Sequence, residues 1–184
     1  MGGILRFTVD MYPANPLLLL PHDACRIVCV ANTPGRAPHG ALHPGDFVVH
    51  CNTAVHADAL MRIPGLWHAV LCRHHTMGVR RPGYFTPASF DGFCVVHFTP
   101  TVNGWSGSPW WETYTRSNPG QCPTTGFCAY RLAQEAARVR GLPVVLLGYR
   151  PGRGEGTYRA RCHAWEYEAA VYEREKAVIV NLNE

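Results

Sequence analysis

The sequence lacks the features that mark membrane-spanning, nucleic-acid-binding and disulfide-rich proteins. Its run of four leucines, Leu17–Leu20, is enclosed by prolines and is too short to cross a bilayer or to form a signal-peptide core. The 17 Lys and Arg residues exceed the 13 Asp and Glu residues, but they form no clustered basic stripe. We therefore expect a soluble protein with no transmembrane segment and no nucleic-acid partner.

The eight cysteines include no C-x-x-C pair, and most lie in apolar runs where cysteine acts as a small buried hydrophobe. This usage favours a reduced, cytoplasmic protein. The 184 residues contain no internal repeat or low-complexity tract, and this length suits one hydrophobic core. We expect a single domain over residues 1–184, with an N-terminal extension over 1–23 and a core from about residue 24.

Short apolar runs between Gly, Pro and Asn residues have the length of β-strands: Arg26–Ala31, Asp46–Cys51, His68–Cys72, Phe93–Phe98, Pro143–Gly148 and Lys176–Leu182. They lack strict alternation, which predicts an α/β fold with a mostly parallel, twisted sheet flanked by helices. Helical spacing predicts helices over about Gly126–Arg140 and His163–Lys176. Residues 76–92 and 99–122 are rich in Gly, Pro and aromatic residues, and we expect long loops there, near a ligand site.

In a sheet of this kind, the loops that leave the carboxyl ends of the strands line the ligand crevice. The turn after the first predicted strand contains Asn32, Thr33, Pro34 and Gly35, whose backbone amides and asparagine side chain could hold a nucleotide or phosphate. Any turn that ends a strand favours these residue types, so the segment can equally be interpreted as an ordinary turn with no ligand. After the second strand, Asn52 could read a base or a sugar hydroxyl, or cap the next helix.

Thr124, Thr125 and Gly126 lie at the start of a predicted helix, where the aligned peptide dipoles favour an anion. Either threonine could instead be a plain N-cap. His163 stands at the predicted start of the next helix, and histidine is well suited to accept a hydroxyl proton near neutral pH. If that helix is regular, Glu166 shares its face and could orient the imidazole.

These segments together resemble the sialyltransferases, both the animal type and the smaller bacterial type. Residues 45–52, GDFVVHCN, are similar to the D-x-V-x-R-C-N strand of the large sialyl motif, with His50 in place of the usual arginine. Residues 123–126, PTTG, the helix after them and the run VVLLGY, which includes Gly148 and Tyr149, are similar to the small motif, P-S-T-G followed by a strand.

The very small motif of this family, H-x4-E, is matched by His163 and Glu168. Tyr158 lies ten residues after Gly148, where the bacterial enzymes place a phosphate-binding tyrosine. The resemblance spans about residues 26–182, and its motifs follow one another in the family's order.

The resemblance implies a Rossmann-like, GT-A-variant domain that transfers a nonulosonic acid from a CMP-activated donor to a glycan hydroxyl with inversion. His163 would be the general base, with Glu166 and Glu168 as further candidates. The asparagines would contact the cytidine, ribose and phosphate, the PTTG residues the nucleotide and the donor carboxylate, and the tyrosine the departing phosphate. These binding residues are Asn32, Asn52, Thr124, Thr125, Gly126 and Tyr158, with Thr33, Pro34, Gly35, Gly148 and Tyr149 beside them.

We expect no metal and no cofactor other than the CMP-sugar co-substrate. The sequence contains no D-x-D motif, the metal-binding mark of many nucleotide-sugar enzymes. CMP leaves as a phosphate monoester, so hydroxyl groups and a helix terminus can stabilise its charge without a metal.

The chain departs from the bacterial pattern around the donor. Fourteen residues separate Gly148 from His163, so the lid would be abbreviated, and Gly152 and Cys122 replace a tyrosine and an arginine. Arginines of the intervening loop could supply the missing donors or be merely solvated: Arg150, Arg153, Arg159 and Arg161. An aromatic cluster could stack on an acceptor sugar or pack in the interior: Trp105, Trp110, Trp111 and Tyr114.

Several alternatives stay open at this point. A CMP-Kdo transferase would use the same CMP and anomeric carboxylate, and a non-catalytic nucleotide-binding protein would tolerate the departures. A zinc site is a further alternative, although the ligand spacing matches no standard closed site: Cys72, His74, His75, Cys162 and His163. The sequence is also compatible with a homo-oligomer, and with a peripheral membrane location if the acceptor is a lipid-linked glycan.

Overall fold

The computed structural model describes residues 21–32, 39–51, 56–60, 62–73, 94–98, 109–151 and 162–180. The described strands are β1 (Arg26–Val30), β2 (Asp46–Cys51), β3 (Trp67–Arg73), β4 (Cys94–Phe98), β5 (Val144–Leu147) and β6 (Val178–Val180). The described helices are η2 (His39–Ala41), α1 (Ala57–Leu60), α3 (Pro109–Ser117), α4 (Thr125–Arg140) and α5 (Trp165–Arg174).

The strands form one six-stranded sheet in the order β4-β3-β2-β1-β5-β6, and every neighbouring pair is parallel. From β1 the chain moves outward through β2 and β3 to β4, and it then crosses to the other side of β1 to form β5 and β6. The predicted α/β class, the parallel sheet and its strands, each within two residues, are confirmed. The order in which the chain adds strands reverses between β1 and β5, and open parallel sheets bind ligands at such a switch point.

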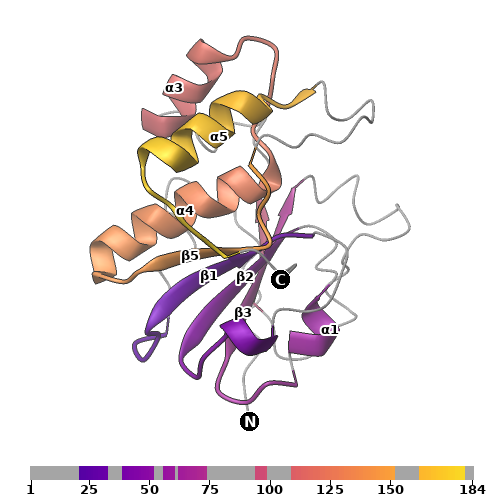
Figure 1. Cartoon of the computed structure of the whole chain (residues 1–184), viewed down its shortest axis with the longest axis vertical. Helices are drawn as coiled ribbons and strands as arrows, with labels where there is room; N and C mark the ends of the chain where they lie inside the picture. The colour runs from indigo at the N-terminus through magenta and orange to yellow at the C-terminus, as the bar shows by residue number, and fades with distance from the viewer. Residues whose placement is uncertain are drawn as a thin grey trace.

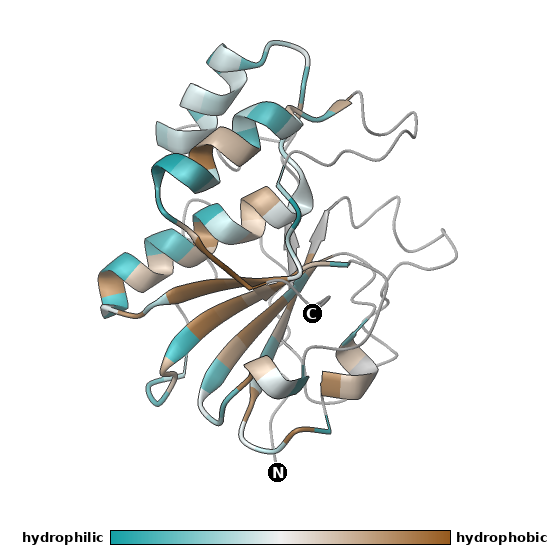
Figure 2. Ribbon diagram, viewed as in Figure 1, coloured by the Kyte–Doolittle hydropathy of each residue, from teal (hydrophilic) through white to brown (hydrophobic). Residues whose placement is uncertain are grey.

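Helices cover both faces of the sheet, as predicted (Figure 1). Side chains of β1 alternate between two apolar clusters, with Ile27 and Cys29 on one face and Val28 and Val30 on the other. The first face packs against α3, α4 and α5, and the second lies on the side of η2 and α1. The strands are accordingly the most apolar part of the ribbon (Figure 2).

The sequence of α4 contains its own start and stop signals. The Thr124 side chain caps the amino end, and Gly141 ends the helix in the left-handed conformation with φ of 67°, which suits glycine. Basic residues Arg138 and Arg140 occupy the last turn, where they complement the helix dipole. The helix predicted over about Gly126–Arg140 is therefore confirmed.

Two expectations about the elements need correction. Residues 99–122 were expected to form a loop, but α3 occupies part of this range because Trp110 and Tyr114 bury their rings against Phe127. Helix α5 begins at Trp165, after an Ala164 N-cap that makes no side-chain hydrogen bond, so His163 precedes the helix. Residues 76–92 lie outside the described residues.

An ion pair fastens the amino ends of β1 and β2. Arg26 donates hydrogen bonds to both carboxylate oxygens of Asp46, from Nε to Oδ1 and from Nη2 to Oδ2, and the second bond is 2.7 Å long. The His43 amide donates to the same carboxylate. This pair lies at the edge of the sheet opposite the carboxyl ends of the strands. Among the described helices, none is both long enough and apolar enough to cross a membrane.

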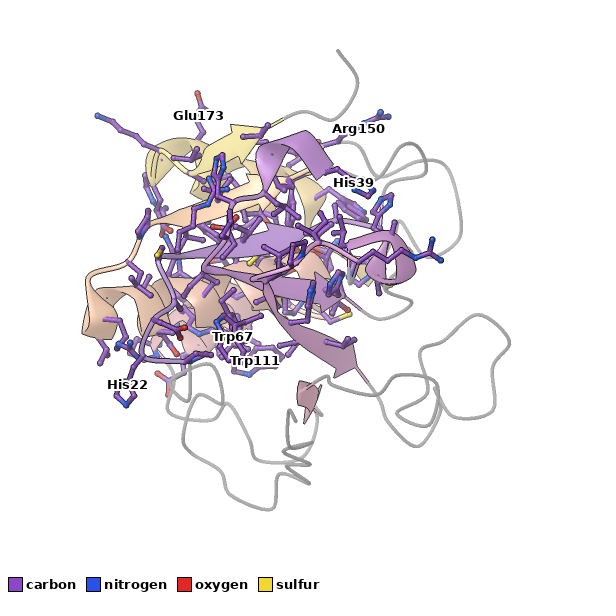
Figure 3. All side chains as sticks on the ribbon, turned by 90° about the horizontal axis from the view of Figure 1, so that it is seen from below. His22, His39, Trp67, Trp111, Arg150 and Glu173 are labelled. Atoms are coloured by element: carbon purple, nitrogen blue, oxygen red, sulfur yellow. The ribbon has the colours of Figure 1, made fainter. Side chains whose placement is uncertain are left out.

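Polar side chains such as Arg150 and Glu173 project outward from the periphery of the fold (Figure 3). Among the described residues, the buried polar or charged ones are few: Asp46, His50, His56, Thr125 and Glu168. Buried polar groups are costly unless they are paired. Two of them, Thr125 and Glu168, belong to the predicted site.

Candidate functional site at the carboxyl edge of the sheet

The ends of β1 and β2 are joined by the side chain of Asn32. Its Nδ2 donates to the Cys51 carbonyl over 2.6 Å, and the neighbouring Ala31 amide donates to the Leu147 carbonyl at the end of β5. The half-buried Asn32 is thus held at the switch point, where the strand order reverses between β1 and β5.

Tyr149, which lies just after β5, packs against the first turn of α4. Its hydroxyl donates to the Gly126 carbonyl over 3.2 Å and also lies beside the Cys51 thiol. A Cβ atom on Gly126 would lie 3.1 Å from a Tyr149 ring carbon, so glycine permits this close approach. Gly148 precedes the tyrosine with φ of 71°, a conformation that favours glycine. The ends of β1, β2 and β5 and the start of α4 therefore form one connected edge.

The amino end of α4 is capped by Thr124. Its Oγ1 accepts a hydrogen bond from the Phe127 amide over 3.0 Å, which is the N-cap role left open by the sequence. Thr125 is buried, and the Gly126 amide lies in the first turn, where the helix itself provides no acceptor. The helix dipole at this end favours an anion.

Glu168 ties α5 to the same cap. Its carboxylate is 3% exposed and accepts 2.7 Å hydrogen bonds from both the amide and the hydroxyl of Thr124. The hydroxyl of Tyr114 donates to it over 3.3 Å. Burial raises the pKa of Glu168 to about 7, against the opposing effect of these hydrogen bonds. This carboxyl group can therefore exchange a proton near neutral pH.

His163 lies beside the segment that leads into α4. Its Nδ1 is 2.7 Å from the Cys122 carbonyl oxygen, which can only accept, so Nδ1 carries the proton and Nε2 of the neutral ring is an acceptor. The Cys122 amide donates to the Cys162 carbonyl, and Gln121 donates to the His163 carbonyl, so the two segments are fixed side by side. Burial opposes a charge on His163, but its contacts with Cys122 outweigh that and raise its pKa.

The expected orientation of His163 by Glu166 is not seen. Glu166 is exposed, and no hydrogen bond joins it to His163 within the described part of the chain. The physical reason is that His163 precedes α5, so the spacing rule for helix faces does not apply to it. The carbonyl of Cys122 holds the imidazole instead.

Other predicted site residues lie outside the described residues: Thr33, Pro34, Gly35, Asn52 and Tyr158. His74 and His75, which entered the zinc alternative, lie outside them too, as does Trp105. Of the aromatic cluster, Trp110 and Tyr114 pack in the interior.

Sequence reasoning missed Tyr114 and Cys122 as parts of this site. The Tyr114 hydroxyl links Glu168 to the start of α5, because it also accepts from the Ala164 amide. Its contacts are with residues about 50 positions away, and a local pattern carries no signal for them. Cys122 was noted only as a replacement for an arginine.

Grooves elsewhere on the surface do not coincide with this edge. One of about 580 Å³ is lined by Tyr130, Arg131 and Val178 among others, and another of about 220 Å³ lies between α3, α4 and α5. Neither includes a residue predicted to bind the nucleotide or to act in catalysis, although Trp110 lines both and the Arg131–Glu175 ion pair lines the larger one. We assign the candidate site from its polar contacts and not from these hollows.

Comparisons with protein-family models, with curated protein sequences and with solved structures find no match. The function is therefore inferred from the chemistry of the site and from the motifs in the sequence.

Proposed function

We propose that this chain is an inverting, metal-independent glycosyltransferase, similar to the sialyltransferases, with His163 as its general base. It would transfer a nonulosonic acid from a CMP-activated donor to a glycan hydroxyl. The observation that carries the proposal is the 2.7 Å contact between His163 Nδ1 and the Cys122 carbonyl. This contact leaves Nε2 as a proton acceptor and holds the ring at Cys122, two residues before the Thr124 cap of a helix whose amino end favours an anion.

The proposed reaction is a single displacement. Nε2 of His163 takes the proton of the acceptor hydroxyl as its oxygen attacks the anomeric carbon. The bond between that carbon and the phosphate oxygen breaks, and CMP leaves with the electron pair. The amino end of α4 favours the charge that develops on the phosphate, so no metal or cofactor is required.

The parallel sheet supports a Rossmann-like interpretation of the fold. The reversal of strand order between β1 and β5 brings Asn32, Gly148 and the start of α4 to the same edge. Nucleotides bind at this position in open α/β sheets. Asn32 would contact the nucleotide there, and Thr125 and Gly126 would approach the phosphate or the donor carboxylate.

Glu168 contributes as a positioning residue in this proposal. It connects the H-x4-E segment to the PTTG segment through Thr124, so the base and the helix amino end keep a fixed relation. Two motifs that the resemblance treats separately are thereby physically joined.

Release of CMP tests the activity. The purified chain is incubated in EDTA with CMP-sialic acid or CMP-Kdo and a panel of glycan acceptors, and free CMP is measured by chromatography. We expect release with one donor and a loss of about 100-fold or more in His163→Ala, the usual contribution of a general base. Glu173→Ala, an exposed change on α5, is the matched control and should keep full activity.

The outcome also separates the remaining alternatives. Turnover of CMP-Kdo alone would keep the mechanism and change the donor. Nucleotide binding without release of CMP from either donor would overturn the enzymatic proposal and favour a non-catalytic nucleotide-binding protein.

A further inference from the structure

Two thiols and one imidazole converge beside the amino ends of α4 and α5. The ligand atoms of Cys122, Cys162 and His163 all lie within 4.8 Å of one another. Cys122 and Cys162 are 40 residues apart in sequence, and the hydrogen bond from the Cys122 amide to the Cys162 carbonyl, 2.9 Å long, holds them together. The cluster is therefore built by the fold and not by local spacing.

The spacing of these atoms suits a tetrahedral metal ion. Bond lengths of about 2.3 Å to sulfur and about 2.0 Å to nitrogen place tetrahedral ligands about 3.6–3.8 Å apart. The Cys122 Sγ to His163 Nδ1 distance is 3.7 Å. The other separations, all under 4.8 Å, need to close by about 1 Å at most, and Cys162 is exposed and can rotate.

The donor set selects the class of metal. Thiolates and imidazole suit zinc-like ions, whereas Mg²⁺ and Ca²⁺ prefer oxygen ligands. Three protein ligands leave a fourth position for water, as in open zinc sites. We propose that Cys122, Cys162 and His163 bind a zinc-like divalent cation. Binding would release the two thiol protons to solvent, and two thiolates would balance the charge of the cation.

The proposed cation site changes which nitrogen of His163 carries the proton. Without the cation, Nδ1 donates its proton to the Cys122 carbonyl and Nε2 is the acceptor. A cation bound at Nδ1 replaces this proton, so the hydrogen bond to the Cys122 carbonyl breaks and the imidazole turns away from that oxygen. The neutral ring then carries its proton on Nε2, which can no longer accept one. Zn²⁺ would therefore inhibit the transferase, a consequence that rests on the proposed function, whereas the site itself does not.

The zinc alternative considered from the sequence shares only part of this set. Cys162 and His163 belonged to it, but Cys122 did not, because nothing in the local sequence connects it with them. The side chain of Cys72 lies outside the described ones.

Titration of the full, reduced chain with Co²⁺ tests the site without any assay of activity. Absorption in the near ultraviolet reports thiolate-to-cobalt charge transfer, and Zn²⁺ should displace the cobalt. We expect saturation at one equivalent and a loss of affinity of about 10-fold or more in Cys162→Ser, since thiolates are the preferred ligands. Cys25→Ser, at an exposed thiol outside the cluster, should bind cobalt like the wild type.

Two results would overturn the site: absence of the charge-transfer band in the wild type, or its persistence in the double variant Cys122→Ser/Cys162→Ser. A second arm measures CMP release with and without Zn²⁺. Inhibition of the wild type that is relieved in Cys162→Ser supports the link to His163. Cobalt binding without inhibition would overturn that link and leave the cation site intact.

Discussion

Glu168 should contribute far more to the free energy of unfolding than Glu166, although both are glutamates in the first turn of α5. Replacing Glu168 with alanine removes two 2.7 Å hydrogen bonds from Thr124 and leaves a partly buried amide without that partner. Each hydrogen bond contributes about 1 kcal/mol net, and an abandoned donor costs about 1 kcal/mol or more. We therefore expect Glu168→Ala to lower the free energy of unfolding by about 3 kcal/mol.

Glu168→Gln separates the hydrogen bonds from the charge. Below the pKa of about 7, most Glu168 side chains hold a proton, and glutamine then offers a similar donor and acceptor in the same shape. At about pH 6 this variant should stay within about 1 kcal/mol of the wild type. Urea unfolding, followed by circular dichroism, measures all of these variants under the same conditions.

The exposed Glu166 provides the control for this comparison. Glu166→Ala should change the free energy of unfolding by no more than about 0.5 kcal/mol, as surface substitutions usually do. If Glu168→Ala and Glu166→Ala had equal effects, Glu168 would not join α5 to the cap of α4 as described.

Two further predictions concern charge in the interior. Burial lowers the pKa of His50 to about 3 and that of His68 to about 4, so the stability that these neutral rings contribute is present above about pH 6.5 and lost as the pH falls. His50 Nε2 lies 3.2 Å from His68 Nδ1, and a positive charge on His68 or His56 would lower the pKa of His50 further. In Glu168→Gln, the lowered pKa of His50 alone should reduce the free energy of unfolding by about 2 kcal/mol as the pH falls from about 7 to about 5. The wild type should lose less, because the raised pKa of Glu168 gives stability that is present at low pH and lost as the pH rises through about 7. Urea unfolding at several pH values measures both slopes, and equal slopes would contradict this opposition. Separately, Asp46→Asn should lower the free energy of unfolding by about 2 kcal/mol, because it breaks the ion pair at the amino ends of β1 and β2. A change below about 0.5 kcal/mol in the urea transition would show that the pair contributes little.

The strands and α4 could be predicted because their signals are local. The apolar runs have strand length, and Thr124 and Gly141 mark the ends of α4 within the sequence itself. Helix α3 could not be predicted, because its surrounding residues favour loops and its stability comes from rings buried against distant helices.

The site was predictable in part. His163 and the PTTG segment were singled out from residue type and position, whereas the choice of Glu166 as the orienting residue assumed a helix that begins too early. Glu168 entered only through the family resemblance, and its bond to Thr124 spans 44 residues. Contacts of this length are fixed by the packing of α5 on α4, which no local pattern reveals.

The most direct measurement is a calorimetric titration of the purified chain with CMP in EDTA, with UMP and AMP as controls. We predict binding of one CMP per chain, little affinity for UMP or AMP, and weaker binding in Asn32→Ala. This result would support a cytidine nucleotide site at the carboxyl edge of the sheet that needs no metal. Absence of CMP binding, or equal binding of all three nucleotides, would contradict the proposed donor and the roles given to Asn32, Thr125 and Gly126.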